Sequence, residues 1–248
     1  MSASHNAQLS WSFGLRNHEG KYLTVETFHS MINCNAAKMK KKQIFFLERG
    51  DGESVYIRTW ANKYLSIDGD GNFTANSDEK TADAALTIEP LADGSWCIVS
   101  HRAQYIYGRG DKMAALIKAN LPAGDQHKFT VHLAMHPQVC IRNVNRSRYL
   151  HLNTKGTPSI TCDEDAPWGD DAVLNLDFNA DGSYSIQTSA GTFLSNDGRL
   201  TDSVGDNNKF VLEFHLSQLA FRSKASQLYL TCAGGDGKLG GQENGFAL

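Results

Sequence analysis

Apolar and polar residues alternate in short stretches that recur about every 40 residues along the chain. Each copy starts with an apolar-x-apolar triplet, and a short polar connection then leads to an aromatic residue followed by an aliphatic one. Val55-Tyr56-Ile57 followed by Tyr64-Leu65 is the clearest copy. The aromatic position is taken in turn by Tyr22, Tyr64, Tyr105, Tyr149, Phe193 and Tyr229. Such alternation is typical of strands with one buried face, so the pattern predicts six copies of one β unit.

A second apolar-x-apolar triplet ends each unit, and it predicts a further strand there. These triplets begin at Phe45, Leu86, Phe129, Leu174, Phe210 and Phe246. The last triplet closes the sequence at Leu248, so we expect the chain to stop where its sixth unit ends. The polar residues 1–10 are expected to fray.

Asp-Gly pairs mark the turns between the expected strands. Asp93-Gly94-Ser95 precedes the third unit in the same way as Asp181-Gly182-Ser183 precedes the fifth. This correspondence divides the six units into two sets of three, with the boundary in residues 134–138. We therefore expect two domains, residues 1–134 and residues 135–248, packed closely because the connection is short.

Two architectures satisfy such a repeat. Six four-stranded blades would form a β-propeller, whereas three units per domain would form two tandem β-trefoils. The Gly-His and Trp-Asp pairs typical of propeller blades are missing from the sequence. The two sets of three therefore favour an all-β protein of two tandem β-trefoil domains with three four-stranded repeats each.

Composition narrows the function classes. The net charge of -3 argues against a globally basic nucleic-acid binder, and the hydrophobic content of 41% supports a buried core. No apolar run approaches about 18 residues, so we expect no membrane insertion. The five cysteines are odd in number and irregularly spaced, which indicates free thiols. We expect Cys97, Cys140 and Cys232 to be small core side chains in or beside strands.

Few residues suggest catalysis or metal binding. Asp68, Asp70 and Asn72 resemble the start of a calcium loop, but Phe73 stands where such loops need glycine, and a hairpin turn is favoured. His132 and His136 are four residues apart, a spacing that suits a metal site on a helix. His132, however, lies in an expected strand. We find no phosphate-binding glycine loop, nucleophile elbow or paired acid and base. The sequence therefore predicts a protein that is not an enzyme, with no cofactor and no metal.

The strongest charge run is the lysine segment, defined here as residues 38–42. Lys38, Lys40, Lys41 and Lys42 place four cations directly before the strand that begins near Phe45. A run at this position is expected on a loop or strand edge, where lysines stay solvated. By itself it is compatible with a solvated loop, with binding to anionic lipid or with a nuclear localisation patch.

A family resemblance covers the whole chain. The matching stretches include residues 13–15, 21–24, 40–44, 132–139, 148–152, 167–169, 197–200, 212–214 and 220–222. Together with the Pro167-Trp168-Gly169 motif, which is not a general trefoil feature, they resemble fascin, an actin-bundling protein of four tandem trefoils. The chain resembles the N-terminal two trefoils, as a fragment or a short form, with the C-terminal trefoils missing.

The resemblance implies binding and cross-linking of actin filaments, in actin bundles of filopodia-like cell protrusions in the cytoplasm. Actin filaments are acidic, so local rather than global positive charge suits the partner. The family's basic sites map onto these residues: Lys21, Lys38, Lys40, Lys41, Lys42, Arg146 and Arg148. Two positions depart from the family. Lys38 replaces the phosphorylatable serine, and Ser147 replaces a basic residue.

Alternatives remain open at this stage. Arg146 and Arg148 could pair with the acidic residues 163–165 instead of binding a partner. A carbohydrate-binding trefoil would repeat a Gln-x-Trp motif, and the four tryptophans lack that context. A third possibility is a structural half-molecule that needs the missing trefoils before it binds anything.

Overall fold

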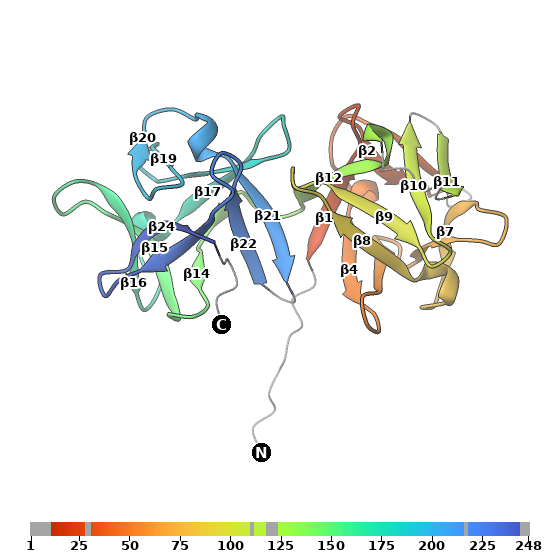
Figure 1. Ribbon diagram of the computed structural model, residues 1–248, viewed down its shortest axis with the longest axis horizontal. Helices are drawn as coiled ribbons and strands as arrows, with labels where there is room; N and C mark the ends of the chain where they lie inside the picture. Colours follow the sequence, from red (N-terminus) through yellow and green to blue (C-terminus); the bar gives the residue numbers. More distant parts are fainter. Residues whose placement is uncertain (1–10, 28–30, 110–111, 118–123, 216–217, 244–248) are drawn as a thin grey trace, which may run out of the picture. The chain divides into compact units, whose positions relative to one another are not determined.

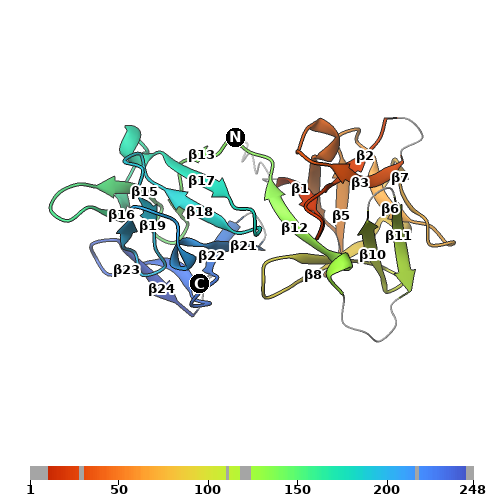
Figure 2. The same cartoon turned by 90° about the horizontal axis from the view of Figure 1, so that it is seen from above.

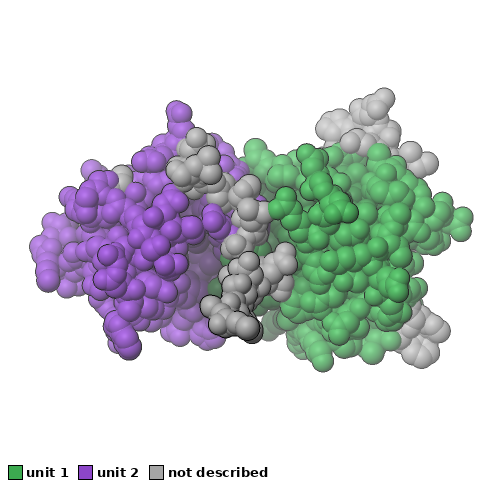
Figure 3. All heavy atoms as spheres, turned by 90° about the horizontal axis from the view of Figure 1, so that it is seen from below, with its two compact units in different colours: residues 1–135 green, residues 136–248 purple. Residues whose placement is uncertain are grey.

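The protein is represented by a computed structural model that describes residues 11–27, 31–109, 112–117, 124–215 and 218–243 (Figure 1). The chain divides into two compact units, residues 1–135 and residues 136–248, which Figure 3 colours separately. Within the described residues, the regular elements are β-strands and 3-10 turns of three residues each.

Unit 1 contains three four-stranded repeats. The first comprises β1 (Ser12–Arg16), β2 (Tyr22–Val25), β3 (Ile32–Ala36) and β4 (Phe45–Arg49), with the 3-10 turn η1 (Lys41–Gln43) before β4. The second comprises β5 (Val55–Thr59), β6 (Tyr64–Ile67), β7 (Phe73–Ser77), η2 (Ala82–Ala84) and β8 (Leu86–Pro90). The third comprises β9 (Trp96–Ser100), β10 (Gln104–Arg109), β11 (Lys112–Ile117), η3 (Asp125–His127) and β12 (Lys128–Leu133).

The strand pairing in unit 1 closes a barrel (Figure 2). Strand β1 pairs with β4 and β12, β5 pairs with β4 and β8, and β9 pairs with β8 and β12, all antiparallel. The remaining strands form the hairpins β2–β3, β6–β7 and β10–β11. A closed six-stranded barrel carrying one hairpin per repeat is the β-trefoil, as the sequence predicted.

Unit 2 repeats this order. Its strands are β13 (Gln138–Val139), β14 (Arg142–Asn143), β15 (Arg148–Asn153), β16 (Ser159–Glu164), β17 (Leu174–Phe178), β18 (Tyr184–Gln187), β19 (Phe193–Leu194), β20 (Leu200–Thr201), β21 (Phe210–His215), β22 (Gln218–Ser223), β23 (Tyr229–Ala233) and β24 (Lys238–Gln242). Two 3-10 turns, η4 (Asp170–Ala172) and η5 (Asp206–Asn208), precede β17 and β21.

Barrel pairings in unit 2 run from β13 through β17, β18 and β21 to β22, and the hairpins are β15–β16, β19–β20 and β23–β24. The chain is thus two tandem β-trefoils. The strand expected at residues 246–248 and the fraying expected for residues 1–10 lie outside the described residues.

The barrel cores are built from the residues that open the predicted triplets. Phe13, Phe45, Phe129 and Phe210 are fully buried. The Phe13 ring lies 5.5 Å from the Trp96 ring and 6.4 Å from the Phe45 ring, measured between centroids. Phe13 and Phe45 come from the first repeat and Trp96 from the third, so this part of the core forms only when the repeats assemble, which is characteristic of repeat folds.

The Asp-Gly-Ser turns confirm the correspondence between the third and fifth units. The Ser95 hydroxyl donates to Asp93 Oδ1 over 2.5 Å, and Leu91 N donates to Ser95 O over 2.8 Å. The equivalent hydroxyl of Ser183 donates to Asp181 Oδ1 over 2.6 Å, with the same backbone bond from Asn179. A hydrogen bond from the serine hydroxyl to the aspartate side chain thus closes each of the two turns in the same way.

A second local feature recurs two residues before the aromatic position. The backbone φ angle there is positive at Gly20 (75°), Asn62 (60°), Ala103 (59°), Ser147 (55°), Gly191 (83°) and Gln227 (61°). A left-handed residue reverses the chain between the first barrel strand and the hairpin of each repeat. Because four of these six residues are not glycine, residue type alone did not reveal the feature.

The cysteines are all free, but they are not equally buried. Cys34, Cys97 and Cys162 are buried, Cys232 is partly exposed and Cys140 is exposed. The expectation that Cys140 is a core side chain is therefore wrong. The pairing of β13 ends at Val139 and β14 starts at Arg142, so Cys140 lies in the break between two short strands.

Candidate functional site

The lysine segment is held at the foot of the first hairpin of unit 1. Lys41 and Lys42 form η1 together with Gln43, whose side chain is buried. Lys40 N donates to Gln43 Oε1 over 2.9 Å, and Gln43 Nε2 donates to Thr24 Oγ1 in β2 over 3.0 Å. One buried amide thereby fixes the backbone of the segment while Lys38, Lys40 and Lys41 remain exposed.

The four lysines have different surroundings. Lys42 Nζ lies 2.7 Å from Glu26 Oε2, and this hydrogen bond is the largest cause of the lowered pKa of Glu26. Lys41 Nζ lies 5.0 Å from the centre of the Trp60 ring, within cation–π range. Lys38 and Lys40 form no ion pair within the described part of the chain. Two cations are therefore engaged and two are available to an external partner.

Lys21 belongs to the same end of the hairpin. Tyr22 pairs with Ala36 across β2 and β3, so Lys21 lies where the chain leaves β3 toward Lys38. Its backbone N–H donates to Asn17 Oδ1 over 2.9 Å, which fixes the turn that precedes β2. The structure thus brings Lys21 and the lysine segment together on one side of unit 1.

Arg146 and Arg148 lie in unit 2, in the arginine loop, defined here as residues 143–148. Asn143 Oδ1 accepts a bond from Arg146 N over 2.9 Å, and Ser147 supplies the left-handed residue of the turn. The Arg148 guanidinium pairs with the Asp165 carboxylate, as the alternative interpretation of the sequence had it. The Arg146 guanidinium instead donates to the carbonyl oxygen of Gly234.

Repeat equivalence relates the two groups of basic residues. Lys21 follows Gly20 and precedes Tyr22, just as Arg148 follows Ser147 and precedes Tyr149. The first repeat of each unit therefore presents a cation at the same place in its turn. Sequence analysis named both residues without detecting that they are equivalent.

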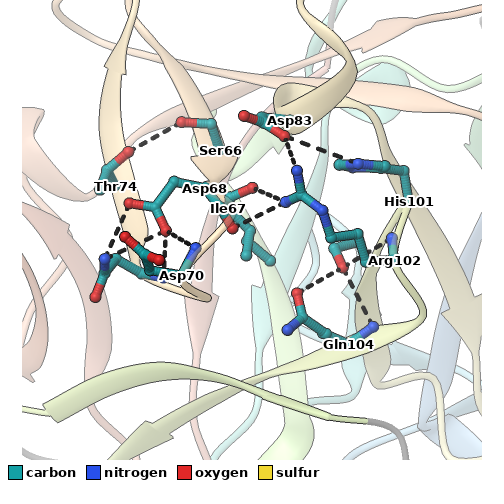
Figure 4. A network of polar contacts seen from close by, with 11 residues as sticks. Ser66, Ile67, Asp68, Asp70, Thr74, Asp83, His101, Arg102 and Gln104 are labelled. Carbon is teal, nitrogen blue, oxygen red and sulfur yellow. Dashed lines mark hydrogen bonds and ion pairs between the residues drawn. The ribbon is translucent and has the colours of Figure 1, made fainter.

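The loop that resembled a calcium site is a hairpin turn (Figure 4). Asp68 Oδ1 accepts bonds from Asp70 N over 3.0 Å and from Asn72 N over 2.9 Å. Arg102 donates to the Ile67 and Asp68 carbonyls and, over 2.7 Å, to Asp83 Oδ1. The Asp68 carboxylate is thus committed to its own turn, in agreement with the favoured hairpin.

The second candidate metal site is the pair His132 and His136. His132 lies within β12, while His136 lies beyond it and accepts a bond from Gln138 N over 3.2 Å, so the two do not share a helical face. Among the residues that the structure describes, no cluster of three or more His, Cys, Asp or Glu side chains could hold a metal ion. In the same residues no helix has the length and apolar character needed to cross a membrane.

Comparison with known proteins assigns the family. The model of the Fascin domain matches residues 19–131 and again residues 139–245. The chain belongs to the fascin family. It is 34% identical over 218 residues to Fascin-2 of Mus musculus and 34% identical over 219 residues to Fascin of Strongylocentrotus purpuratus.

The region of similarity takes up different shares of this chain and of its relatives. The matched part is 86% of this fascin-family chain but only 43% of the mouse protein and 44% of the sea urchin protein. The chain therefore spans less than half the length of these relatives. Among solved structures, the designed 3-fold symmetric protein ThreeFoil has a TM-score of 0.44 at 16% identity, over 49% of this chain and 97% of that one.

Sequence analysis missed the residues that restrain the basic side chains of this fascin-family chain. Glu26, Trp60 and Gly234 contact Lys42, Lys41 and Arg146 respectively. They come from other strands or repeats and carry no motif. Only a scan for charge complementarity across the first hairpin could have suggested Glu26 as a partner.

Proposed function

We propose that this chain binds actin filaments through basic surfaces on its trefoils, as part of a fascin-type cross-linker. The observation that carries the proposal is the lysine segment, in which Lys38 and Lys40 are exposed on a backbone fixed by buried Gln43. Ordered cations that have no counterion among the described residues suit an acidic partner. Lys21 extends this surface, and Arg146 with Arg148 forms a second contact on unit 2.

Several contacts must act together. An exposed ion pair contributes only about 0–1 kcal/mol, so one lysine cannot hold a filament. Binding that depends on many such pairs weakens as salt screens them. The proposed function is therefore a salt-sensitive association with filaments, without catalysis, in the actin bundles of cell protrusions.

Bundling requires two separated filament contacts on one molecule. The lysine segment lies in unit 1 and the arginine loop in unit 2, so the chain carries candidates for both. Because it spans less than half of its relatives, we propose filament binding for this chain and full bundling for a protein that includes further trefoils.

Regulation is proposed to differ from the family pattern. Lys38 occupies the position of the family's phosphorylatable serine, and Ala36 and Ala37 precede it, so no hydroxyl is present there. Phosphorylation at this position cannot switch the lysine segment off. Lys38 instead adds a permanent charge.

Co-sedimentation with filaments at two centrifugal speeds and over a salt series tests the proposal. Pelleting at high speed alone means binding without bundling, and pelleting at low speed means two contacts in this chain. Loss of pelleting with rising salt supports the basic surfaces. Absence of the chain from both pellets at low salt contradicts filament binding.

A further inference from the structure

The three hairpins of unit 2 surround a cavity of about 700 Å³. The hairpin β15–β16 forms one wall, with Ser159, Thr161 and Asp163 of β16 in the lining. These residues alternate along the strand, so their side chains share one face of the hairpin. The turn of β19–β20 and the residues around the start of β24 form the other walls. The volume is within the range of about 300–1,000 Å³ that is typical of small-molecule sites.

Two of the three hairpin turns pack tightly against a neighbouring hairpin. A β-carbon at Gly198 would overlap with the carbonyl oxygen of Leu239 in β24, and one at Gly237 would lie 2.7 Å from the carbonyl oxygen of Cys162 in β16. A β-carbon at Gly156, in the turn of β15–β16, would meet no atom within 4 Å. This third turn therefore stands clear of the other hairpins at that point, and it forms an open rim of the cavity.

Unit 1 differs at the corresponding place. Its strands β3, β7 and β11 contact one another in all three pairs. The matching strands of unit 2 are β16, β20 and β24, and β20 has two residues, whereas β3 and β7 have five each and β11 has six. The short β20 leaves part of the β16 face uncovered, which explains why the cavity forms in unit 2.

The cavity is lined by one cation from each hairpin, namely Lys155, Arg199 and Lys238. Lys155 is exposed and forms no ion pair within the described part of the chain. The Arg199 side chain is 85% exposed, and its Nε lies 3.5 Å from Asp197 Oδ2. An exposed pair of this kind is weak, so the Arg199 guanidinium can turn to a ligand.

The two lining carboxylates already have partners inside unit 2. Asp163 Oδ1 lies 2.8 Å from His151 Nε2, and Asp236 Oδ2 lies 3.0 Å from Lys238 Nζ. His151 is buried behind the wall, where the Thr161 hydroxyl also lies 3.0 Å from its Nε2. The acids therefore face their own partners, and the lining offers positive charge to a ligand.

Neutral groups complete the lining. The hydroxyls of Thr157 and Ser159 line the cavity and have no hydrogen-bond partner among the residues that the structure describes. Pro158 and Leu200 add apolar surface. Cations bind phosphate groups, free hydroxyls bind the hydroxyls of a polyol, and an apolar wall suits the C–H face of a ring.

We infer that this cavity binds a phosphorylated polyol ring of the inositol phosphate class, either free or as the headgroup of a lipid. Lys155, Arg199 and Lys238 hold the phosphates, while Thr157 and Ser159 contact the ring hydroxyls. Basic pockets are known to bind such headgroups. The inference does not depend on filament binding, because the cavity lies in unit 2 and includes no residue of the lysine segment.

Titration calorimetry of the full chain with inositol trisphosphate tests the inference. We expect saturable binding of one ligand per chain. Inorganic phosphate and unphosphorylated inositol each offer only part of the ligand, so each should bind at least about 10-fold more weakly. Absence of trisphosphate binding at low salt, or equally tight binding of inorganic phosphate, would overturn the inference.

Variants locate the binding site. K155E/R199E reverses two lining charges, and S159F fills the cavity without changing the charge. Each should lower the affinity at least about 10-fold, with thermal unfolding as the check that the fold is kept. K38E/K40E makes the same change of charge in unit 1 and should bind the ligand as the wild type does. Unchanged affinity in either cavity variant, or an equal loss in K38E/K40E, would overturn the inference.

Vesicles distinguish the two sources of the ligand. The chain is floated with phosphatidylcholine vesicles that contain phosphatidylinositol bisphosphate. Capture that K155E/R199E abolishes assigns a lipid headgroup, and trisphosphate binding without capture assigns a free inositol phosphate. If the trisphosphate binds as expected but the chain does not bind filaments, the proposed function fails while this inference stands.

Discussion

The Tyr22 hydroxyl lies 2.7 Å from His132 Nδ1 and joins the first hairpin of unit 1 to the last strand of its barrel. Three other repeats make the same contact with an acid: Tyr64 donates to Glu48 over 3.0 Å, Tyr105 to Glu89 over 2.6 Å and Tyr229 to Glu213 over 2.7 Å. His132 thus replaces a glutamate in a recurring phenol contact. In the fifth repeat Phe193 has no hydroxyl to donate.

The stability of the protein should depend on the protonation of His132. Burial, aided by the charge of Arg16, lowers the pKa of His132 to about 4 from its ordinary value of 6.5. Between pH 6.5 and pH 4 the unfolded chain therefore binds a proton at His132 that the folded chain does not bind. The contribution of this residue to stability is fully present above pH 6.5 and falls as the pH drops toward 4. We expect a loss of about 2 kcal/mol from this residue by pH 5.

Urea unfolding of the wild type and of H132Q at pH 7.5 and pH 5 measures this effect. H132Q should lose less stability between the two pH values, by the amount that His132 contributes. The carboxylates titrate equally in both proteins, so their contribution to the pH dependence cancels in the difference. Identical pH dependence of the two proteins would contradict a half-buried His132 that stays neutral in the folded state.

Glu48 should contribute strongly to the stability of unit 1. It accepts bonds from Arg58 Nε over 2.5 Å and Tyr64 over 3.0 Å, and Lys80 Nζ lies 3.1 Å away. The variant E48Q loses the charge that three donors share while most of the side chain stays buried. We expect a fall of about 1–3 kcal/mol in the free energy of unfolding. The exposed E53Q serves as a control, and an equal effect of both variants would refute this role.

Replacing Ala103 with glycine should stabilise the protein. Its φ angle of 59° puts a β-carbon in the left-handed region, where the equivalent turns of other repeats have Gly20 and Gly191. Left-handed backbone costs an L-residue about 1–2 kcal/mol, which exceeds the extra entropy of glycine in the unfolded chain. A103G should therefore gain about 0.5 kcal/mol in thermal or urea unfolding. A61G, in the equivalent turn but without a positive φ, should lose stability.

The double variant K38E/K40E should weaken filament binding. These two side chains are exposed and form no ion pair among the described residues, so their reversal does not disturb the Gln43 anchor. At about 0–1 kcal/mol per contact, we expect affinity to fall roughly 10-fold and the salt dependence to become shallower. Co-sedimentation over a salt series measures both. The control K155E, an exposed lysine of unit 2, should bind as the wild type does.

Adding charge at position 147 should strengthen the same association. Ser147 stands between Arg146 and Arg148, and its left-handed backbone already tolerates a β-carbon. S147R should raise filament affinity roughly 3-fold at low salt, with the gain disappearing at high salt. The neutral variant S147Q distinguishes charge from size. An equal gain in both variants would show that the charge has no part in it.

The period of the repeats and the local turns were determined by the sequence alone. Alternating triplets, Asp-Gly pairs and the recurring aromatic are local signals, because strand and turn conformations depend on neighbouring residues. They predicted the triplets in β1, β5 and β9 and the equivalence of Asp93 with Asp181. They also located the lysine segment, although not the 3-10 turn that contains Lys41 and Lys42.

Tertiary structure alone decided which distant side chains meet. The contacts between Tyr22 and His132, Lys42 and Glu26, and Arg148 and Asp165 each join residues from different strands or loops. Their spacings follow from closing a barrel and docking hairpins on it, so no short motif encodes them. The same closure decided that Cys140 lies outside the core while Cys162 lies within it. Barrel closure brings every repeat against its neighbours at once, and a chain examined one stretch at a time cannot reveal that.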